Sequence, residues 1–354
     1  MKKLYYRFSD NLIFLFVVFM GVMLIMLRDS VADGIKNALT LTGEVLIPSL
    51  LPFMILSSFA VEISADRVLS PVTEPFMRRV FRLPGKSFAV LLFGFVGGYP
   101  VGMSLATKLY EKGMLNESDV RHISSFCVNA GPAFTVMIAG GAVAGSRKAG
   151  FVMLISTVIS SLLTGIAYSF FKKRPVKEAV SVTEKADFST ALVNAVRGSQ
   201  GSILSVCSWV MAFSVVLSVA ECYITDENIY LLFSAFAEVT NGVRSAMKAA
   251  GVCGMAAAIS FGGLSVMCQL MPMIKKCGIK AKFYLTFRIV NSLLSYCITK
   301  LILCFVTVDV QVFSQDIALS GNNAPASAAL LIMGAVFIYD LQKNGQYQSS
   351  FSSR

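Results

Sequence analysis

The chain has few charged residues and few of the side chains that enzymes use for metal binding or nucleophilic catalysis. Only 14% of its 354 residues are Asp, Glu, Lys or Arg, and His122 is its single histidine. A lone histidine does not make a zinc site or a nucleophile triad, so we interpret it as a residue near a helix start. There is no HExxH motif and no pair of aspartates in an apolar segment. We therefore predict no enzyme activity, no catalytic residues, no metal site and no cofactor.

The cysteines do not form the patterns of a disulfide framework or a metal-binding module. There are eight, none in a CxxC pair, and most lie within apolar segments, as packed thiols do: 127, 207, 222, 253, 268, 277, 297 and 304. Hydrophobic residues make up 55% of the chain and its mean hydropathy is +0.70. This balance excludes a disordered, nucleic-acid-binding or secreted disulfide-rich protein and indicates a membrane protein.

Apolar segments recur along the whole chain and predict an all-α polytopic membrane protein. The first follows a basic start and is interpreted as a retained signal-anchor helix, with cleavage near Ser30-Val31-Ala32 as the alternative. The segments cover residues 12–27, 45–61, 88–107, 122–144, 149–171, 200–220, 229–249, 252–274, 284–308 and, weakly, 326–339. They divide the chain into residues 1–44 (anchor helix and connection), 45–171 (first repeat), 172–199 (basic linker), 200–308 (second repeat) and 309–354 (tail).

Two of these segments contain turn residues at their centres. Residues 88–107 are interrupted by Gly97-Gly98-Tyr99-Pro100-Val101-Gly102, and residues 229–249 by Glu238-Val239-Thr240-Asn241-Gly242. Each arm beside a break has about 10 residues, or about 15 Å of helix, half of the ~30 Å hydrocarbon thickness. We therefore predict two re-entrant helical hairpins whose tips surround a cavity, because unwound backbone is tolerated there only inside protein or beside water.

The distribution of positive charge supports this topology. With a cytoplasmic N-terminus and two hairpins, 23 of the 31 Lys and Arg lie inside, six outside and two within a span. If residues 88–107 crossed the membrane instead, the basic linker would face outward.

The two halves also share a second feature, a span broken near its middle. The breaks are Asn129-Ala130-Gly131-Pro132 and Ser260-Phe261-Gly262-Gly263. Broken helices at corresponding places of two inverted halves are typical of the midplane site of a secondary transporter. The fold class we predict is an inverted repeat with two re-entrant hairpins and two broken transmembrane helices.

Three motifs carry a resemblance to a known family. The runs TEPFMRRVFRLPG (73–85), GFVGGYPVG (94–102) and FCVNAGPAF (126–134) resemble the YlbJ/SpoVV family of sporulation integral membrane proteins. That family groups with nucleoside-recognition or Gate-domain proteins and is similar to concentrative nucleoside transporters. The resemblance covers roughly residues 40–310 and implies a carrier of the outer forespore membrane that moves dipicolinic acid toward the forespore.

The resemblance also implies which residues bind the solute. In similar carriers the hairpin tips and the unwound helices hold it, and the first hairpin with the following helix holds sodium. By position, the substrate-binding residues here are Gly97, Gly98, Tyr99, Asn129, Ala130, Gly131, Glu238, Thr240, Asn241 and Ser260. Family members often have two consecutive asparagines where this chain has Val128 and Asn129, so one potential ligand is absent. The coupling ion, Na⁺ or H⁺, is left open.

Glu238 is the sharpest single signal, because a carboxylate at midplane depth costs about 2.5–3.5 kcal/mol on insertion scales unless it is paired or hydrated. Its candidate partners are a cation, a transported proton, or Arg244 across the hairpin. Arg244 or Lys248 is also a candidate to neutralise an anionic solute. Asn129 has a structural alternative, a hydrogen bond between helices, and Tyr99 either stacks on a solute ring or packs.

We therefore predict a secondary carrier of a small organic anion in a bacterial cell membrane or outer forespore membrane. Its expected partners are the solute and lipids, with a possible homo-oligomer and no nucleic acid. The alternatives are a nucleoside or metal-ion carrier of the Gate-domain type, or a membrane scaffold for spore-envelope assembly that transports nothing.

Overall fold

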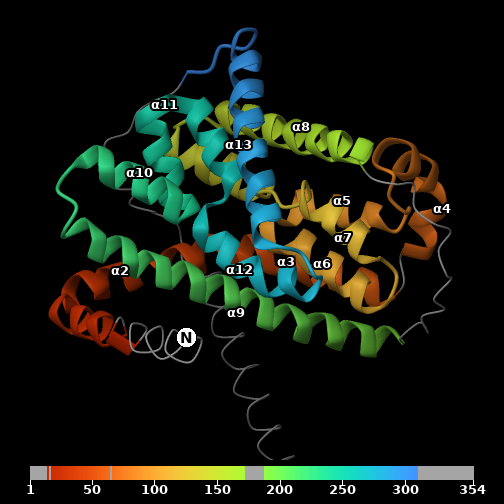
Figure 1. The fold of residues 1–354 in the computed structure, drawn as a ribbon, viewed down its shortest axis with the longest axis horizontal. Coiled ribbons are helices and arrows are strands. Elements are labelled where there is room, and N and C mark those ends of the chain that lie inside the picture. The colour runs from red at the N-terminus through yellow and green to blue at the C-terminus, as the bar shows by residue number, and fades with distance from the viewer. Residues whose placement is uncertain (1–13, 16, 64–65, 172–186, 310–354) are drawn as a thin grey trace, which may run out of the picture.

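The computed structural model describes residues 14–15, 17–63, 66–171 and 187–309, and over that range it contains helices and no strand (Figure 1). The helices are α2 (Arg28–Leu41), η1 (Thr42–Leu46), α3 (Ile47–Glu62), α4 (Asp66–Phe76), η2 (Met77–Phe81), α5 (Ser87–Gly97), α6 (Tyr99–Glu111), α7 (Glu117–Ser124), η3 (Ala133–Val143), α8 (Arg147–Phe171), α9 (Phe188–Glu221), α10 (Glu227–Ala237), α11 (Val239–Phe261), α12 (Gly263–Lys276) and α13 (Ala281–Leu303). An apolar helix, Val17–Met26, precedes α2.

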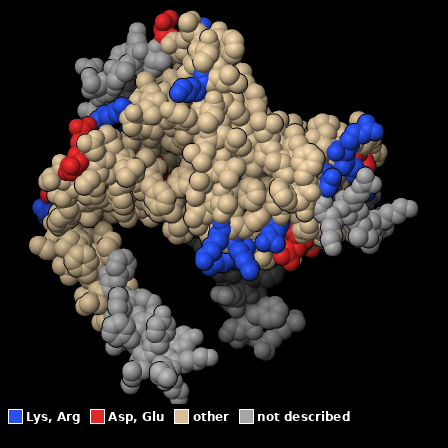
Figure 2. Space-filling view, turned by 45° about the horizontal axis from the view of Figure 1, so that its top comes forward, with Lys and Arg blue, Asp and Glu red and all other residues tan. Residues whose placement is uncertain are grey.

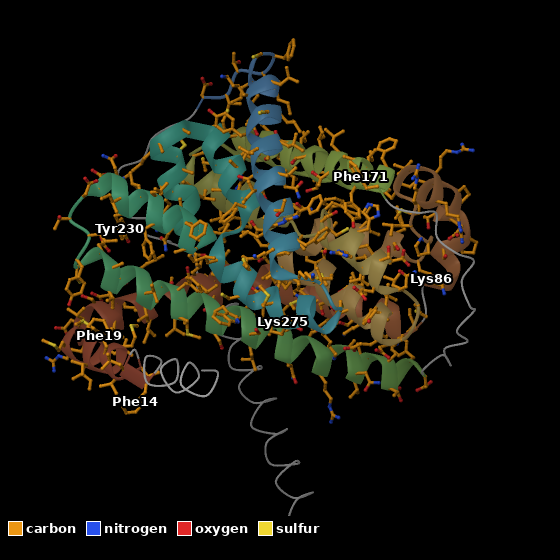
Figure 3. The ribbon with its side chains drawn as sticks, in the orientation of Figure 1. Phe14, Phe19, Lys86, Phe171, Tyr230 and Lys275 are labelled. Carbon is orange, nitrogen blue, oxygen red and sulfur yellow. The ribbon has the colours of Figure 1, made fainter. Side chains whose placement is uncertain are left out.

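Several helical stretches match the length and composition of a membrane span. Five described stretches are long and apolar enough to cross a bilayer: Arg28–Glu62, Arg147–Phe171, Phe188–Glu221, Val239–Lys276 and Ala281–Leu303. Large apolar side chains such as Phe19 and Phe171 lie exposed on the outside of the bundle (Figure 3). Figure 2 shows Lys and Arg in separate groups at the margins of a surface that is mostly uncharged. The chain is an integral, multi-pass membrane protein.

The predicted break in residues 88–107 is present and is limited to one residue. Gly98 separates α5 from α6 and has φ 88°, ψ −178°, a conformation that only glycine adopts readily. The two helices pack side by side, and a Cβ added at Gly102 would lie 2.9 Å from the Cα of Gly94. The segment therefore folds as a helical hairpin.

The second hairpin is formed by α10 and the first part of α11. Its junction is narrower than predicted, because only Glu238 has extended backbone and Thr240 to Gly242 already belong to α11. Further along, α11 is kinked at Ala250 and Gly251, where the backbone leaves helical geometry. The kink ends the hairpin arm and starts the next helical stretch.

Both predicted broken spans are broken in the structure. Residues 125–131 are not helical and separate α7 from the helical turn at Pro132 and the π-helix η3. In the second half, Gly262 (φ 83°) separates α11 from α12, and Gly263, the first residue of α12, also has a positive φ (76°). Positive φ at two adjacent residues explains why a pair of glycines stands at this position.

Each hairpin junction packs against the glycine break that follows it in the chain. A Cβ at Gly98 would lie 3.4 Å from the backbone nitrogen of Gly131, and a Cβ at Gly263 would lie 3.2 Å from that of Val239. The order of elements is therefore the same in both halves: hairpin, broken helix, long helix (α8 or α13). In Figure 1, α5 and α6 lie to the right of the centre and α10 and α11 to the left. Inversion of the two halves across a membrane, and re-entry of the hairpins, stay predictions.

The structure has helices in several stretches that the sequence analysis left outside the apolar segments, among them α4 and η2 between segments 45–61 and 88–107. Residues 28–41, assigned to a connection, form α2, which packs along α9 because Gly34 allows close approach to Ser214 and Ser218. Helix α9 begins at Phe188, inside the stretch assigned to the basic linker, and runs for 34 residues. The weak segment 326–339, and the start of the first apolar segment, lie outside the described residues.

Candidate functional site

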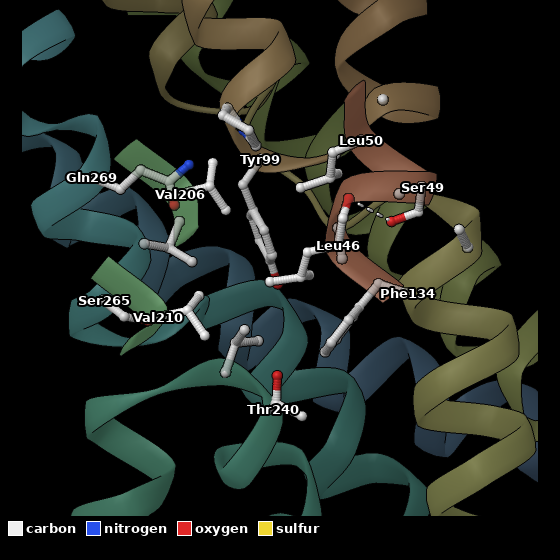
Figure 4. A pocket seen from close by; sticks show the side chains of 18 of the residues that line it. Leu46, Ser49, Leu50, Tyr99, Phe134, Val206, Val210, Thr240, Ser265 and Gln269 are labelled. Atoms are coloured by element: carbon white, nitrogen blue, oxygen red, sulfur yellow. Dashed lines mark hydrogen bonds between the residues drawn. The ribbon is translucent and has the colours of Figure 1, made fainter. Parts of the chain in front are cut away.

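A cavity lies where the two hairpin junctions meet the helix breaks (Figure 4). Its volume is about 50 Å³, space for a few water molecules. In this view the ring of Tyr99 lies between Val206 and Gln269 on one side and Leu46 and Leu50 on the other. The remaining lining residues are Ser49, Val96, Gly97, Gly98, Pro100, Ala130, Gly131, Ala133, Phe134, Val210, Glu238, Val239, Thr240, Ser265 and Val266. We refer to it as the central cavity.

The structure brings together most of the residues that the sequence placed at a binding site. Seven of the ten predicted residues line the central cavity: Gly97, Gly98, Tyr99, Ala130, Gly131, Glu238 and Thr240. The cavity is thus built from the first hairpin, the first break and the second hairpin, with additional walls from η1, α3, α9 and α12.

Glu238 is buried at the tip of the second hairpin, where its carboxylate caps α11. One carboxylate oxygen accepts hydrogen bonds from the backbone amides of Thr240 and Asn241, both at 2.9 Å. A carboxylate at a helix N-terminus satisfies unpaired amides and meets the positive end of the helix dipole. The partner of Glu238 is therefore a helix end, and no ion pair joins it to Arg244 among the described residues.

Asn129 is buried at the first break but does not line the central cavity. Its amide nitrogen donates to the carbonyl of Phe126 at 2.8 Å, and its oxygen accepts from Ser161 of α8 at 2.6 Å. These two hydrogen bonds to the surrounding protein agree with the alternative interpretation of Asn129, a structural hydrogen bond between helices. In this conformation Asn129 ties the unwound segment to α8.

The other two predicted residues also lie away from the central cavity. Ser260 is buried at the end of α11, and its hydroxyl has no hydrogen-bond partner among the described residues. Asn241 faces a second, larger cavity of about 550 Å³, which Thr240 shares with the central cavity. This outer cavity is lined mainly by α2, α9, α10 and α11.

The two basic residues proposed as charge partners have different surroundings. Arg244 lines the outer cavity and makes no hydrogen bond or ion pair with any described residue. Lys248 is exposed and pairs with Glu227 at 3.1 Å, near the open end of the second hairpin. Of these two residues, only Arg244 lines a cavity, and that cavity is the outer one.

The sequence analysis missed Gln269, which places in the cavity wall a hydrogen-bond donor without a partner in the described part of the protein. Gln269 lies on α12, one turn after Ser265, and both side chains line the cavity. Its amide nitrogen is buried and has no hydrogen-bond partner among the described residues. A buried amide donor without a partner costs about 1–3 kcal/mol, so an acceptor atom on a solute would relieve that cost. The sequence feature that could have indicated Gln269 is its position: a side-chain amide in an apolar segment, shortly after the glycine break at Gly262-Gly263.

The lining of the central cavity combines a few polar groups with a mostly apolar wall. A carboxylate, an amide, three aliphatic hydroxyls (Ser49, Thr240 and Ser265) and two aromatic rings (Tyr99 and Phe134) stand in a largely apolar wall, and none of the lining residues is Lys or Arg. Among the described residues, no group of three or more His, Cys, Asp or Glu side chains gathers where it could hold a metal ion. Convergent polar groups in an apolar pocket are typical of small-molecule binding sites.

Comparison with known proteins agrees with the motif resemblance. Residues 44–171 match the family described as Gate, nucleoside recognition. Over 241 residues the chain is 26% identical to the sporulation integral membrane protein YlbJ of Bacillus subtilis (strain 168), and the match spans 61% of this chain but only 58% of that protein. No solved structure matches. Residues 44–171 of this multi-pass membrane protein are therefore similar to the Gate, nucleoside-recognition family, and the chain is similar to YlbJ.

Proposed function

We propose that this protein is a secondary carrier that binds a small, flat, polar solute between its two hairpin junctions. The observation that supports this most directly is the central cavity itself, in which both junctions and the first break meet around the buried carboxylate of Glu238 and the unpaired amide of Gln269. No covalent chemistry is part of this proposal.

The conformation supports alternating access. The central cavity holds only about 50 Å³, whereas the outer cavity beside it measures about 550 Å³. A solute the size of a nucleoside therefore requires the hairpins to move apart before it binds. Thr240 lines both cavities, so the start of α11 is the wall that would move.

A nucleoside fits the lining best. It is uncharged, has a flat ring for the apolar walls and Tyr99, and offers hydroxyl and ring groups to Glu238 and Gln269. The description of the matching family, nucleoside recognition, points the same way. A dianion would meet a carboxylate without any basic residue in the wall.

Dipicolinic acid is the second candidate, and one observation favours it. The N-terminus of α6, at Tyr99, faces the central cavity, and helix N-termini bind carboxylates. The chain is also similar to a protein named for sporulation. For this solute we propose a carrier in the outer forespore membrane with its N-terminus in the cytoplasm.

The test is uptake into proteoliposomes that contain the purified full chain. Radiolabelled uridine and dipicolinate are offered separately, and thermal stability is measured with each. We expect uridine to accumulate and to raise the Tm, and Gln269→Ala to weaken its binding about tenfold through loss of one hydrogen bond.

Gln200→Ala is the matched control, because Gln200 lies on α9 and lines neither cavity. Accumulation of dipicolinate alone would select the second candidate. Neither uptake nor stabilisation with either solute, in a folded protein, would contradict the carrier and favour a scaffold in the spore envelope.

A further inference from the structure

Arg288 is the most deeply buried of the described Lys and Arg residues. The sequence analysis predicted no function for it. It lies on α13 and is 2% exposed. It forms no ion pair with a carboxylate in the described part of the chain. The carbon of its guanidinium lies 5.4 Å from the ring centroid of Tyr284, one turn earlier on the same helix.

The guanidinium of Arg288 reaches the carbonyls of both helix breaks. It donates to the backbone oxygens of Val128 and Ser125, the latter at 3.3 Å, where the chain leaves α7. It also lies 3.5 Å from the carbonyl of Ser260, in the last turn of α11. One side chain therefore joins two segments that are far apart in the sequence.

The charge of Arg288 matches the charge of its surroundings. The C-terminal end of a helix carries about half a negative charge on its unpaired carbonyls, so two such ends present about one negative charge. The single positive charge of the guanidinium balances them, and its planar set of donors serves several carbonyls at once. A second cation at the same carbonyls would meet a like charge at close range.

Neighbouring side chains complete the same network. One turn after Arg288, Asn291 donates to Ser125 O at 2.9 Å and accepts from Thr164 of α8 at 2.7 Å. Tyr99, at the first hairpin junction, donates to the carbonyl of Ile259 at 2.6 Å. The freed carbonyls of both breaks thus receive protein donors from α13 and from the wall of the central cavity.

In broken-helix carriers, freed carbonyls and half-helix ends of this kind coordinate the coupling cation. We propose that the guanidinium of Arg288 is a built-in cation of the two breaks, and that it takes the place of a bound sodium ion there. As a statement about transport, this rests on the proposed carrier function. As a statement about what holds the breaks, it is tested without any transport assay.

The first test compares the thermal stability of the purified wild-type chain in sodium, potassium and choline chloride at equal concentration. We expect the same Tm in all three salts, because the carbonyls of the breaks already have a cation. A Tm that rises in sodium alone would overturn the proposal.

The second test compares Arg288→Lys with Arg288→Met, two side chains of similar length that differ in charge. We expect Arg288→Met to lower the Tm by roughly 5–15 °C, and Arg288→Lys to lower it less, because lysine keeps the charge but not the planar set of donors. Arg147→Lys and Arg147→Met, at an exposed arginine of α8, are the matched controls and should leave the Tm unchanged.

If Arg288→Met were as stable as Arg288→Lys, the charge would not be what the breaks need, and the proposal would fail. Should Arg288→Met not fold at all, Arg288→Lys still decides: its Tm should remain independent of sodium. A sodium-dependent Tm in that variant would show that a metal ion serves the site, against the proposal.

Transport separates this inference from the proposed function. With the solute that the wild type takes up, we expect equal initial rates in sodium, potassium and choline media. Uptake that requires sodium would overturn the role of Arg288 and leave the carrier function intact. Absence of uptake in every medium would contradict the carrier function, while the Tm comparisons would still decide what Arg288 does.

Discussion

At the scale of single residues, the central cavity depends on positions where one backbone or side-chain property is required. Gly98 supplies a backbone conformation, Glu238 a capping carboxylate, and Gln269 an unpaired donor. The three residues differ in how well the sequence alone predicts their importance. Gly98 and Glu238 stood out by composition in an apolar segment, whereas the importance of Gln269 emerges only from what surrounds it.

Replacing Gly98 with alanine tests the junction of the first hairpin. The φ of 88° is strained for alanine, and its Cβ would lie 3.0 Å from Leu50 and 3.4 Å from Gly131. We expect Gly98→Ala to destabilise the protein by about 1–3 kcal/mol, measured as a lower Tm. Gly201→Ala, at an open helical position of α9, is the control and should stabilise slightly. Equal stability of the two variants would contradict the geometry of the junction.

Replacing Glu238 with alanine tests its function as a helix cap. Loss of the hydrogen bonds to Thr240 and Asn241 should cost about 0.5–2 kcal/mol, again measured as a decrease in Tm. The control is Asp226→Ala, which removes the exposed carboxylate that caps α10 of the same hairpin. If solute binding uses Glu238, only Glu238→Ala will also reduce uptake. Uptake by the Glu238→Ala variant at the wild-type rate would show that Glu238 does not contribute to solute binding.

At the scale of elements, the sequence predicted which segments are broken more reliably than where helices begin. Clusters of glycine and proline in apolar segments mark breaks because they disturb the helix locally, whatever the tertiary context. The extra helix α2 and the early start of α9 were missed because both stretches are polar enough to resemble connections. Both pack against neighbouring helices: α2 lies against the later part of α9, where Gly34 is close to Ser214 and Ser218, and the start of α9 lies against α3, where Phe188 contacts Phe59.

The element-scale prediction concerns which ends of the hairpins share a side of the membrane. Because α5 and α6 lie side by side and are joined at Gly98, Lys86 and Lys112 stand at the same open end. We expect Lys86→Cys and Lys112→Cys to react with a membrane-impermeant thiol reagent from one side. Asp226→Cys and Lys248→Cys, at the open end of the second hairpin, should react from the other.

The experiment uses a background in which the exposed native cysteines, Cys222, Cys297 and Cys304, are replaced by serine. Labelling of the Lys86 and Lys112 positions from opposite sides would make the first hairpin an ordinary crossing. The inverted repeat would then be wrong as well.

At the scale of the whole molecule, the two halves are joined by a few polar contacts through an apolar interior. Tyr99 links the first hairpin to the second break, and Arg288 links both breaks to α13. In a bilayer such contacts matter because no water is available to donate a hydrogen bond to a buried carbonyl that lacks a protein donor.

Tyr99→Phe tests one of these links while preserving the ring. It removes the 2.6 Å hydrogen bond to Ile259 O, so we expect a loss of about 1–3 kcal/mol in stability, from the unpaired carbonyl. Thermal unfolding measures it, with Tyr223→Phe as the control, since Tyr223 is 59% exposed. A Tyr99→Phe protein as stable as the control would show that this link between the halves is energetically unimportant.

The sequence by itself determined the class of protein, the two hairpins, the two broken helices and seven of the residues around the central cavity. These follow from local properties: apolar length, glycine and proline in apolar segments, and a carboxylate where none is tolerated without a partner. Only the tertiary structure decided the orientation of Asn129 toward α8, the capping of α11 by Glu238, the position of Gln269 in the cavity wall, and the position of Arg288 at the two helix breaks. Those outcomes depend on which buried donor meets which buried acceptor, and segments distant in the chain supply the two partners.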